Sequence, residues 1–202
     1  MYRPDHHGRQ IIEEHPEETI AQMDTVIGKT GGKCLLTILF TNCDLQLIYL
    51  RDRNNAKTVS DVFKSLRSTL GREDFCRLFK VILTDRGSEF TDPLSIEADP
   101  DTGEIDCHLF YCDPLQSNQK SNCERNHELI RYVIPKGKTM NDLTQDKINM
   151  LMNHINSYPR KKWNDKSPYE VFISIYGEVI AQKLGLKSIS TNDIFLRPDL
   201  IK

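Results

Sequence analysis

Residues 81–90 are Val-Ile-Leu-Thr-Asp-Arg-Gly-Ser-Glu-Phe, a short apolar run that ends in an acidic turn. Together with Phe79 and Lys80, the run predicts a short buried strand over residues 79–84, because apolar and β-branched residues dominate it. Asp85 would then stand at the end of that strand, and Gly87 predicts a tight loop after it. Asp85 is compatible with a turn-forming residue before glycine and with a functional carboxylate at the lip of a sheet.

The segments around this strand predict a mixed α/β fold. Strands are expected over residues 19–27, 33–41 and 45–50, joined by short turns as an antiparallel meander. A helix is expected over residues 59–70, and a fifth strand over residues 105–112. Further helices are expected over residues 124–133 and 143–157, and another opens at Ser167 with a capping box. The expected fold is therefore ribonuclease-H-like, with a mixed five-stranded sheet of three antiparallel strands and then parallel strands, flanked by helices.

Length and composition are those of a soluble globular domain. The chain has 202 residues, of which 38% are hydrophobic and 28% charged. We expect a linker over residues 1–18, a catalytic core over 19–160 and a C-terminal helical extension over 161–202. No apolar run is long enough for a membrane span, and the N-terminus lacks the apolar segment of a signal peptide. Six scattered cysteines without a Cys-x-x-Cys pair argue against a zinc site and favour reduced thiols in a cytoplasmic protein.

The net charge of −2 hides an asymmetry along the chain. Residues 88–106 contain seven acids and no base, whereas residues 116–166 contain ten bases and five acids. If a polyanion binds, the later half of the chain is expected to hold it. A solvated basic face would have a similar composition, so this pattern alone leaves both interpretations open.

Three carboxylates occupy positions where a fold can hold them rigidly. Asp24 lies in a half-apolar strand, where burial would require a partner, a metal or exposure. Asp85 ends the strand described above, and Glu124 lies on an expected helix. On that helix Lys120, Glu124, Glu128 and Arg131 share one face, which is compatible with a salt-bridged solvent face or with Glu124 reaching a metal.

Four segments together resemble the DDE transposases of bacterial insertion sequences, in the retroviral-integrase superfamily, and more narrowly the insertion-sequence-thirty family. The likeness runs from about residue 19 to residue 202. Its most specific parts are the stretch 81–90; Phe110-Tyr111-Cys112-Asp113-Pro114; the run from Glu124 to Gly137; and Asn153-His154-Ile155-Asn156-Ser157 followed by Ser167-Pro168-Tyr169-Glu170.

This resemblance implies a polynucleotidyl transferase whose catalytic and metal-binding residues are Asp24, Asp85 and Glu124. Glu128 is the acid most easily mistaken for the third of these. Two Mg²⁺ or Mn²⁺ ions would serve cleavage at transposon ends and strand transfer into target DNA. The DNA backbone would be held by basic residues of the later half: Lys120, Arg125, Arg131, Lys136, Arg160, Lys161 and Lys162.

Related enzymes act as multimers, so a homo-oligomer in the bacterial cytoplasm is expected. The helix-turn-helix region that precedes the core in the family is expected to be absent from this chain. The sequence departs from the family at Arg86, where asparagine is usual, at Ser121, where glycine is usual, and at Asn118, where tryptophan is common. A cation at position 86 could pair with a carboxylate and weaken metal binding. Two alternatives stay open: a ribonuclease-H-like nuclease, and an inactive core, with Arg86 as its mark, that only binds DNA or oligomerises.

Overall fold

The computed structural model describes residues 19–112 and 121–202, apart from the side chains of residues 121, 122 and 124. Its centre is a five-stranded sheet with the order β3-β2-β1-β4-β5. The strands are β1 (Ile20–Ile27), β2 (Cys34–Phe40), β3 (Leu45–Arg51), β4 (Val81–Thr84) and β5 (His108–Tyr111). The first three strands pair antiparallel, whereas β4 runs parallel to β1 and β5 runs parallel to β4. This is the predicted ribonuclease-H-like sheet, and the fold class is confirmed.

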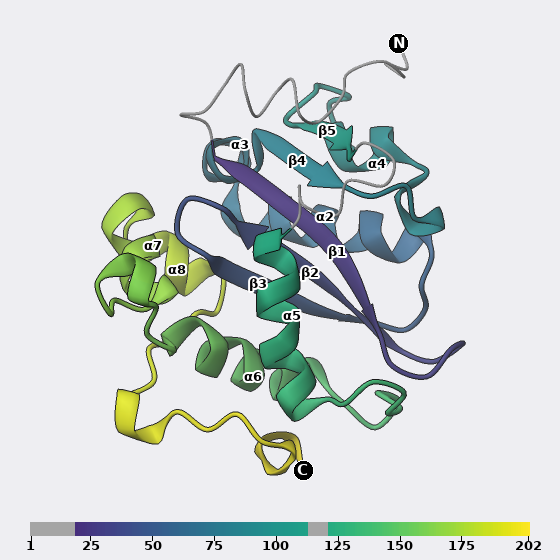
Figure 1. Cartoon of the computed structure of the whole chain (residues 1–202). Coiled ribbons are helices and arrows are strands. Elements are labelled where there is room, and N and C mark those ends of the chain that lie inside the picture. The colour runs from purple at the N-terminus through teal and green to yellow at the C-terminus, as the bar shows by residue number, and fades with distance from the viewer. Residues whose placement is uncertain (1–18, 113–120) are drawn as a thin grey trace.

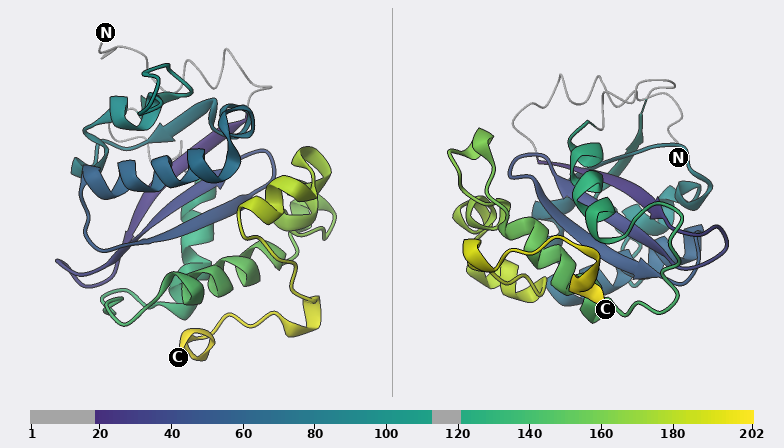
Figure 2. Two further views of the ribbon diagram at one scale, coloured as in Figure 1. Left: turned by 180° about the vertical axis from the view of Figure 1, so that it is seen from behind. Right: turned by 60° about the horizontal axis from the view of Figure 1, so that its bottom comes forward.

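The helices lie on both faces of the sheet. They are α2 (Ala56–Leu70), α3 (Arg72–Phe79), α4 (Pro93–Glu97), α5 (Ser121–Val133), α6 (Gln145–Ser157), α7 (Pro168–Tyr176) and α8 (Glu178–Lys183). Short 3-10 turns are η1 (Ser88–Phe90), η3 (Lys161–Trp163), η4 (Thr191–Asp193) and η5 (Pro198–Ile201). Helix α5 crosses one face of the sheet and α2 covers the other, as opposite views show (Figures 1 and 2).

Buried aromatic rings join the sheet to α2, α3 and α7. The ring of Phe40 on β2 lies 5.5 Å from that of Phe79 and 6.0 Å from that of Phe172. Phe63 on α2 contacts Phe75 and Phe79 with centroid distances of 6.3 and 5.7 Å. Such pairs contribute about 0.5–1.5 kcal/mol each beyond the burial of their area. The C-terminal helices thus share one hydrophobic core with the sheet, and the predicted domain boundary at residue 160 stays a prediction.

Side chains of α6 satisfy the outer edge of β3. Asn156 accepts a hydrogen bond from the backbone N–H of Gln46 at 2.9 Å and donates to its carbonyl at 2.8 Å. Gln145 accepts from the N–H of Leu50 at 2.8 Å and donates to the carbonyl of Ile48 at 3.0 Å. An edge strand with unpaired backbone groups would otherwise offer a template for another chain. Helix α6 therefore closes this edge of the sheet.

The structure corrects several element boundaries. Phe79, predicted to begin a strand, is the last residue of α3, and β4 begins at Val81. Gly71 ends α2 with a φ of 79° and also precedes α3, so the predicted helix stop is a junction between two helices. The fifth strand is confined to His108–Tyr111, because Ile105 forms an isolated bridge with Ala98 instead. The capping box of Ser167 and Glu170 is confirmed.

The expected linker over residues 1–18 lies outside the described residues. Within residues 19–112 and 121–202, every helix is too short or too polar to cross a lipid bilayer.

Candidate functional site

Asp24 and Asp85 lie where β1 and β4 part. The parallel pairing of these strands runs from Ile20 opposite Val81 to Gln22 opposite Leu83. One residue further, the hydroxyl of Thr84 donates to the carbonyl of Met23 at 3.1 Å. Asp85 follows Thr84 directly, so continuing this register by one more residue would bring Asp85 opposite Asp24, although the paired part of the ladder ends at Gln22 and Leu83. Asp24 is inside β1 rather than at its end, because β1 continues to Ile27 against β2.

The turn after β4 holds the Asp85 carboxylate. Its Oδ1 accepts a hydrogen bond from the backbone N–H of Gly87 at 3.0 Å. A Cβ added at Gly87 would lie 2.6 Å from Oε2 of Glu89 and 3.1 Å from Oδ1 of Asp85, so any larger residue there would have to displace these two acidic side chains. Glu89 is thus a buried acidic side chain close to Asp85, which sequence reasoning counted only as part of an acidic segment. Arg86 is exposed and forms no ion pair with another described residue.

Helix α5 places two further side chains over Asp24. His127 Nδ1 lies 3.9 Å from Oδ2 of Asp24, and the Oδ1 of Asp24 accepts the N–H of Thr25 at 2.8 Å. The Nε2 of His127 lies 2.9 Å from the hydroxyl of Thr37 and 3.6 Å from the sulfur of Cys123. Thr37 is the partner of Asp24 across the β1–β2 ladder and donates to its carbonyl at 3.1 Å.

Sequence reasoning missed Cys123 and His127. They are four residues apart and therefore share one face of α5. That spacing was the available signal. Its meaning depends on the packing of α5 against β1, which the spacing alone does not reveal.

Glu124 lies on α5 between these two residues in sequence, but its side chain is outside the described part of the structure. Helix α5, which carries Glu124, packs against β1 (Figure 1). Its His127 lies 3.9 Å from the Asp24 carboxylate. Glu128 is exposed. The assignment of Glu124 as the third carboxylate stays a prediction.

The carboxylates of Asp24 and Asp85 suit a hard divalent cation. Mg²⁺ prefers oxygen ligands and is commonly held by one or two carboxylates together with water and phosphate. Each aspartate has one oxygen oriented by a backbone N–H, which fixes the carboxylate plane. These residues therefore fit the expected ion, which would be held by Asp24 and Asp85.

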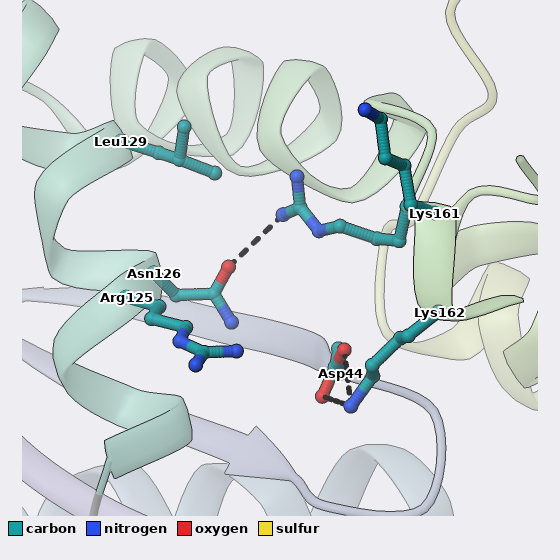
Figure 3. Close-up of a pocket in the computed structure, with 7 residues that line it drawn as sticks. Asp44, Arg125, Asn126, Leu129, Lys161 and Lys162 are labelled. Carbon is teal, nitrogen blue, oxygen red and sulfur yellow. Dashed lines mark hydrogen bonds and ion pairs between the residues drawn. The ribbon is translucent and has the colours of Figure 1, made fainter.

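Four of the predicted DNA-binding residues gather around one pocket. The pocket has a volume of about 410 Å³ and is lined by Asp44, Arg125, Asn126, Leu129, Arg160, Lys161 and Lys162. Figure 3 shows the α5 residues on one side and the segment that carries Lys161 and Lys162 on the other. Four cations against the single carboxylate of Asp44 leave the lining with a formal charge of +3.

The cations of this basic pocket differ in how they are held. Lys162 pairs with Asp44 at 2.7 Å, and Arg160 donates to the side-chain oxygen of Asn126 at 3.0 Å. Burial lowers the pKa of Arg160 below its ordinary value. Arg125 and Lys161 are exposed, and neither forms an ion pair with another described residue. Arg125 and Lys161 are therefore the better placed to meet an incoming anion.

The other predicted DNA-binding residues do not line the pocket. Lys120 lies outside the described residues. Arg131 donates to the carbonyl of Ile27 at the end of β1 at 3.0 Å, and burial lowers its pKa. Lys136 is exposed in the segment after α5. Arg131 thus has a structural contact at the end of β1, while a DNA contact of Lys136 stays a prediction.

Comparison with known proteins identifies relatives among mobile elements. The transposase for insertion sequence element IS4351 of Bacteroides fragilis is 28% identical over 178 residues, which are 85% of this chain and 52% of that protein. The putative integrase ORF3 of Spiroplasma virus SpV1-R8A2 B is 27% identical over 152 residues, 75% of this chain and 45% of that protein. The transposase InsI for IS30A of Escherichia coli K12 is 28% identical over 128 residues, 62% of this chain and 30% of that protein.

The chain is similar to proteins named as transposases of insertion sequences, IS30A among them, and to a putative viral integrase. It spans about half the length of the first two of these relatives. No protein-family model matches it. The likeness to insertion-sequence transposases and the ribonuclease-H-like sheet both agree with the resemblance stated from the sequence motifs.

Proposed function

We propose that the chain is the catalytic part of a transposase that cuts DNA at the ends of a mobile element and joins the ends to a target. The observation that supports this best is that Asp24 and Asp85 each come two residues after the last paired residues, Gln22 and Leu83, of two parallel strands in a ribonuclease-H-like sheet. The names of the relatives, two insertion-sequence transposases and a putative integrase, point in the same direction. Because the chain covers only about half of the first two relatives, the whole activity is a proposal.

In this proposal the carboxylates of Asp24, Asp85 and Glu124 hold two Mg²⁺ or Mn²⁺ ions. Ions bound there would neutralise the charge that develops on the reacting phosphate. The chain's own contribution is positioning: backbone N–H groups orient both aspartates, and α5 brings Glu124 over the sheet. Buried Glu89 adds negative potential beside Asp85, which strengthens the attraction for a cation.

The basic pocket would hold the DNA backbone rather than read its sequence. Lysine and arginine contacts to phosphates position a duplex without distinguishing bases. The pocket uses Arg125, Asn126 and Leu129 of α5, whereas Cys123 and His127 on another face of the same helix lie over Asp24. One helix would therefore link the phosphate contacts to the carboxylates.

A labelled duplex with the terminal sequence of the mobile element that encodes the chain tests the proposal. With Mg²⁺, the wild type should nick this duplex and join the freed 3′ end to a second DNA. Asp24→Asn and Asp85→Asn should each lower both rates by at least about a hundredfold, since even the hydrogen-bond partners of metal ligands affect activity by about 10–100-fold. Asp61→Asn is the matched control, because Asp61 is an exposed residue of α2 paired with Lys57.

The pattern of products separates the alternatives. Hydrolysis without joining, on this duplex and on branched or hybrid substrates, would identify a nuclease instead. Mg²⁺-independent binding without any chemistry would indicate a core that only binds DNA, and a gain of metal affinity in Arg86→Asn would attribute that loss of chemistry to Arg86; no gain would weaken this alternative. Equal activity of Asp24→Asn and Asp61→Asn would overturn the catalytic assignment. The expected homo-oligomer stays a prediction, which light scattering with and without DNA would test.

A further inference from the structure

The side chains of Asp24, Cys123 and His127 form a cluster whose ligand atoms suit a metal other than Mg²⁺. One ligand atom from each residue lies within 4.8 Å of the other two. Cys123 is fully buried, while the side chains of His127 and Asp24 are 18% and 22% exposed. Solvent therefore reaches the cluster at Asp24 and His127 but not at Cys123.

The distance between sulfur and nitrogen matches a tetrahedral metal site. Zinc binds cysteine sulfur at about 2.3 Å and histidine nitrogen at about 2.0–2.1 Å, so the two atoms of a tetrahedral site lie about 3.6 Å apart. The sulfur of Cys123 lies 3.6 Å from Nε2 of His127. The Asp24 carboxylate lies 3.9 Å from the other ring nitrogen, Nδ1, and one of its oxygens lies within 4.8 Å of the ligand atoms of Cys123 and His127, so it would have to move closer to become the third ligand. Thr37 would give up its contact with Nε2 but keep its bond to the Asp24 carbonyl.

We propose that Asp24, Cys123 and His127 bind Zn²⁺, with water as the fourth ligand. A thiolate and an imidazole select zinc and cobalt, whereas Mg²⁺ prefers oxygen ligands alone. In the sequence, the absence of a Cys-x-x-Cys pair argued against a zinc site. Here, however, two ligands stand four residues apart on one helix and the third lies on a strand. That arrangement follows the spacing by which two histidines on one helix face bind zinc.

The site shares Asp24 with the Mg²⁺ site, and this consequence rests on the proposed function. Zn²⁺ bound through Cys123 and His127 would take the Asp24 carboxylate away from Mg²⁺. Free zinc would then inhibit DNA cleavage in competition with Mg²⁺. A mobile element would gain a transposase whose activity falls when zinc is abundant.

Cobalt titration of the full chain tests the binding site without any DNA. Co²⁺ should give the near-ultraviolet thiolate band and the visible bands of a tetrahedral complex, saturating at one ion per chain. Cys123→Ser should abolish the thiolate band, and His127→Gln should weaken cobalt binding at least about tenfold. Cys76→Ser is the matched control: Cys76 is a partly exposed cysteine of α3, a helix that packs against α2, and its loss should leave the spectrum unchanged. An excess of Mg²⁺ should not remove the thiolate band.

Three results would overturn the site: no thiolate band in folded wild type, a band that survives Cys123→Ser, or a band lost in Cys76→Ser. Should Cys123→Ser fail to fold by circular dichroism, zinc X-ray absorption of the wild type decides instead, since the site requires one sulfur at about 2.3 Å. Absence of sulfur from that spectrum contradicts the proposal.

Inhibition is measured separately. The zinc concentration that halves Mg²⁺-supported cleavage should be at least about tenfold higher for Cys123→Ser than for wild type, each compared with its own zinc-free rate. A cobalt spectrum without DNA cleavage would refute only the transposase proposal. Cleavage without a cobalt spectrum would refute only the zinc site.

Discussion

Asp106 holds together three elements on the α2 face of the sheet. Its carboxylate binds Arg67 Nε at 3.0 Å and Arg72 Nε at 2.9 Å, and the Arg67 side chain also donates to the carbonyl of Ile96. The Asp106 side chain is 0% exposed and that of Arg67 is 6% exposed. Removing one partner of a buried pair leaves the other charge uncompensated. Asp106→Ala should therefore lower the free energy of unfolding by about 3–5 kcal/mol in urea denaturation.

Asp61→Ala provides the comparison, because the Lys57–Asp61 pair is exposed on α2. Exposed ion pairs within a helix contribute little, so this variant should stay within about 0.5 kcal/mol of wild type. If Asp106→Ala and Asp61→Ala lost similar amounts of unfolding free energy, burial would not set the strength of the Arg67–Asp106 pair.

The last turn of α6 anchors the C-terminal segment through three side chains. Asn153 accepts the N–H of Lys187 at 3.0 Å, Ser157 accepts that of Ile189 at 2.9 Å, and His154 Nδ1 accepts that of Phe195 at 3.1 Å. Only neutral histidine has a nitrogen that can accept this bond. Burial lowers the pKa of His154 below its ordinary value of 6.5, against the opposing effect of Asp193.

The lowered pKa gives this anchor a defined pH dependence. The unfolded segment binds the proton more strongly than the folded one, so the stabilisation is complete above pH 6.5 and is lost as the pH falls below that value. Hydrogen exchange of the Phe195 amide, corrected for its intrinsic rate, should therefore accelerate between pH 7.5 and 5.5. His154→Gln should show no such acceleration. An acceleration of equal size in both proteins would assign the effect to another group.

At the scale of elements, the sequence correctly predicted those strands and helix ends that depend only on the pattern of neighbouring residues. The strands of the meander and the Ser167 capping box followed from apolar runs and turn residues. Helix α3 did not, because its eight residues follow directly on Gly71, which also ends α2. The alignment of Asp24 with Asp85 could be expected from the fold. The contact of Cys123 and His127 with Asp24 could not, since it depends on how α5 packs on β1.

At the scale of the whole molecule, charge is separated despite a net value of −2. The basic pocket carries Arg125 and Lys161 on the α5 side of the sheet, whereas α2 covers the opposite face (Figures 1 and 2).

Each protein cation that neutralises a duplex phosphate releases counterions and contributes about 0.9 to the slope of log affinity against log salt. The double variant Arg125→Gln, Lys161→Gln should therefore reduce the magnitude of that slope by about 1.8. This loss should be the same for duplexes of different sequence, because phosphate contacts do not distinguish bases. Fluorescence anisotropy over a series of salt concentrations measures it. Lys64→Gln removes an exposed cation from α2 and should leave the slope unchanged. If Lys64→Gln lowers the slope as much per charge as the double variant does, DNA does not bind at the pocket, and general electrostatic attraction explains the affinity.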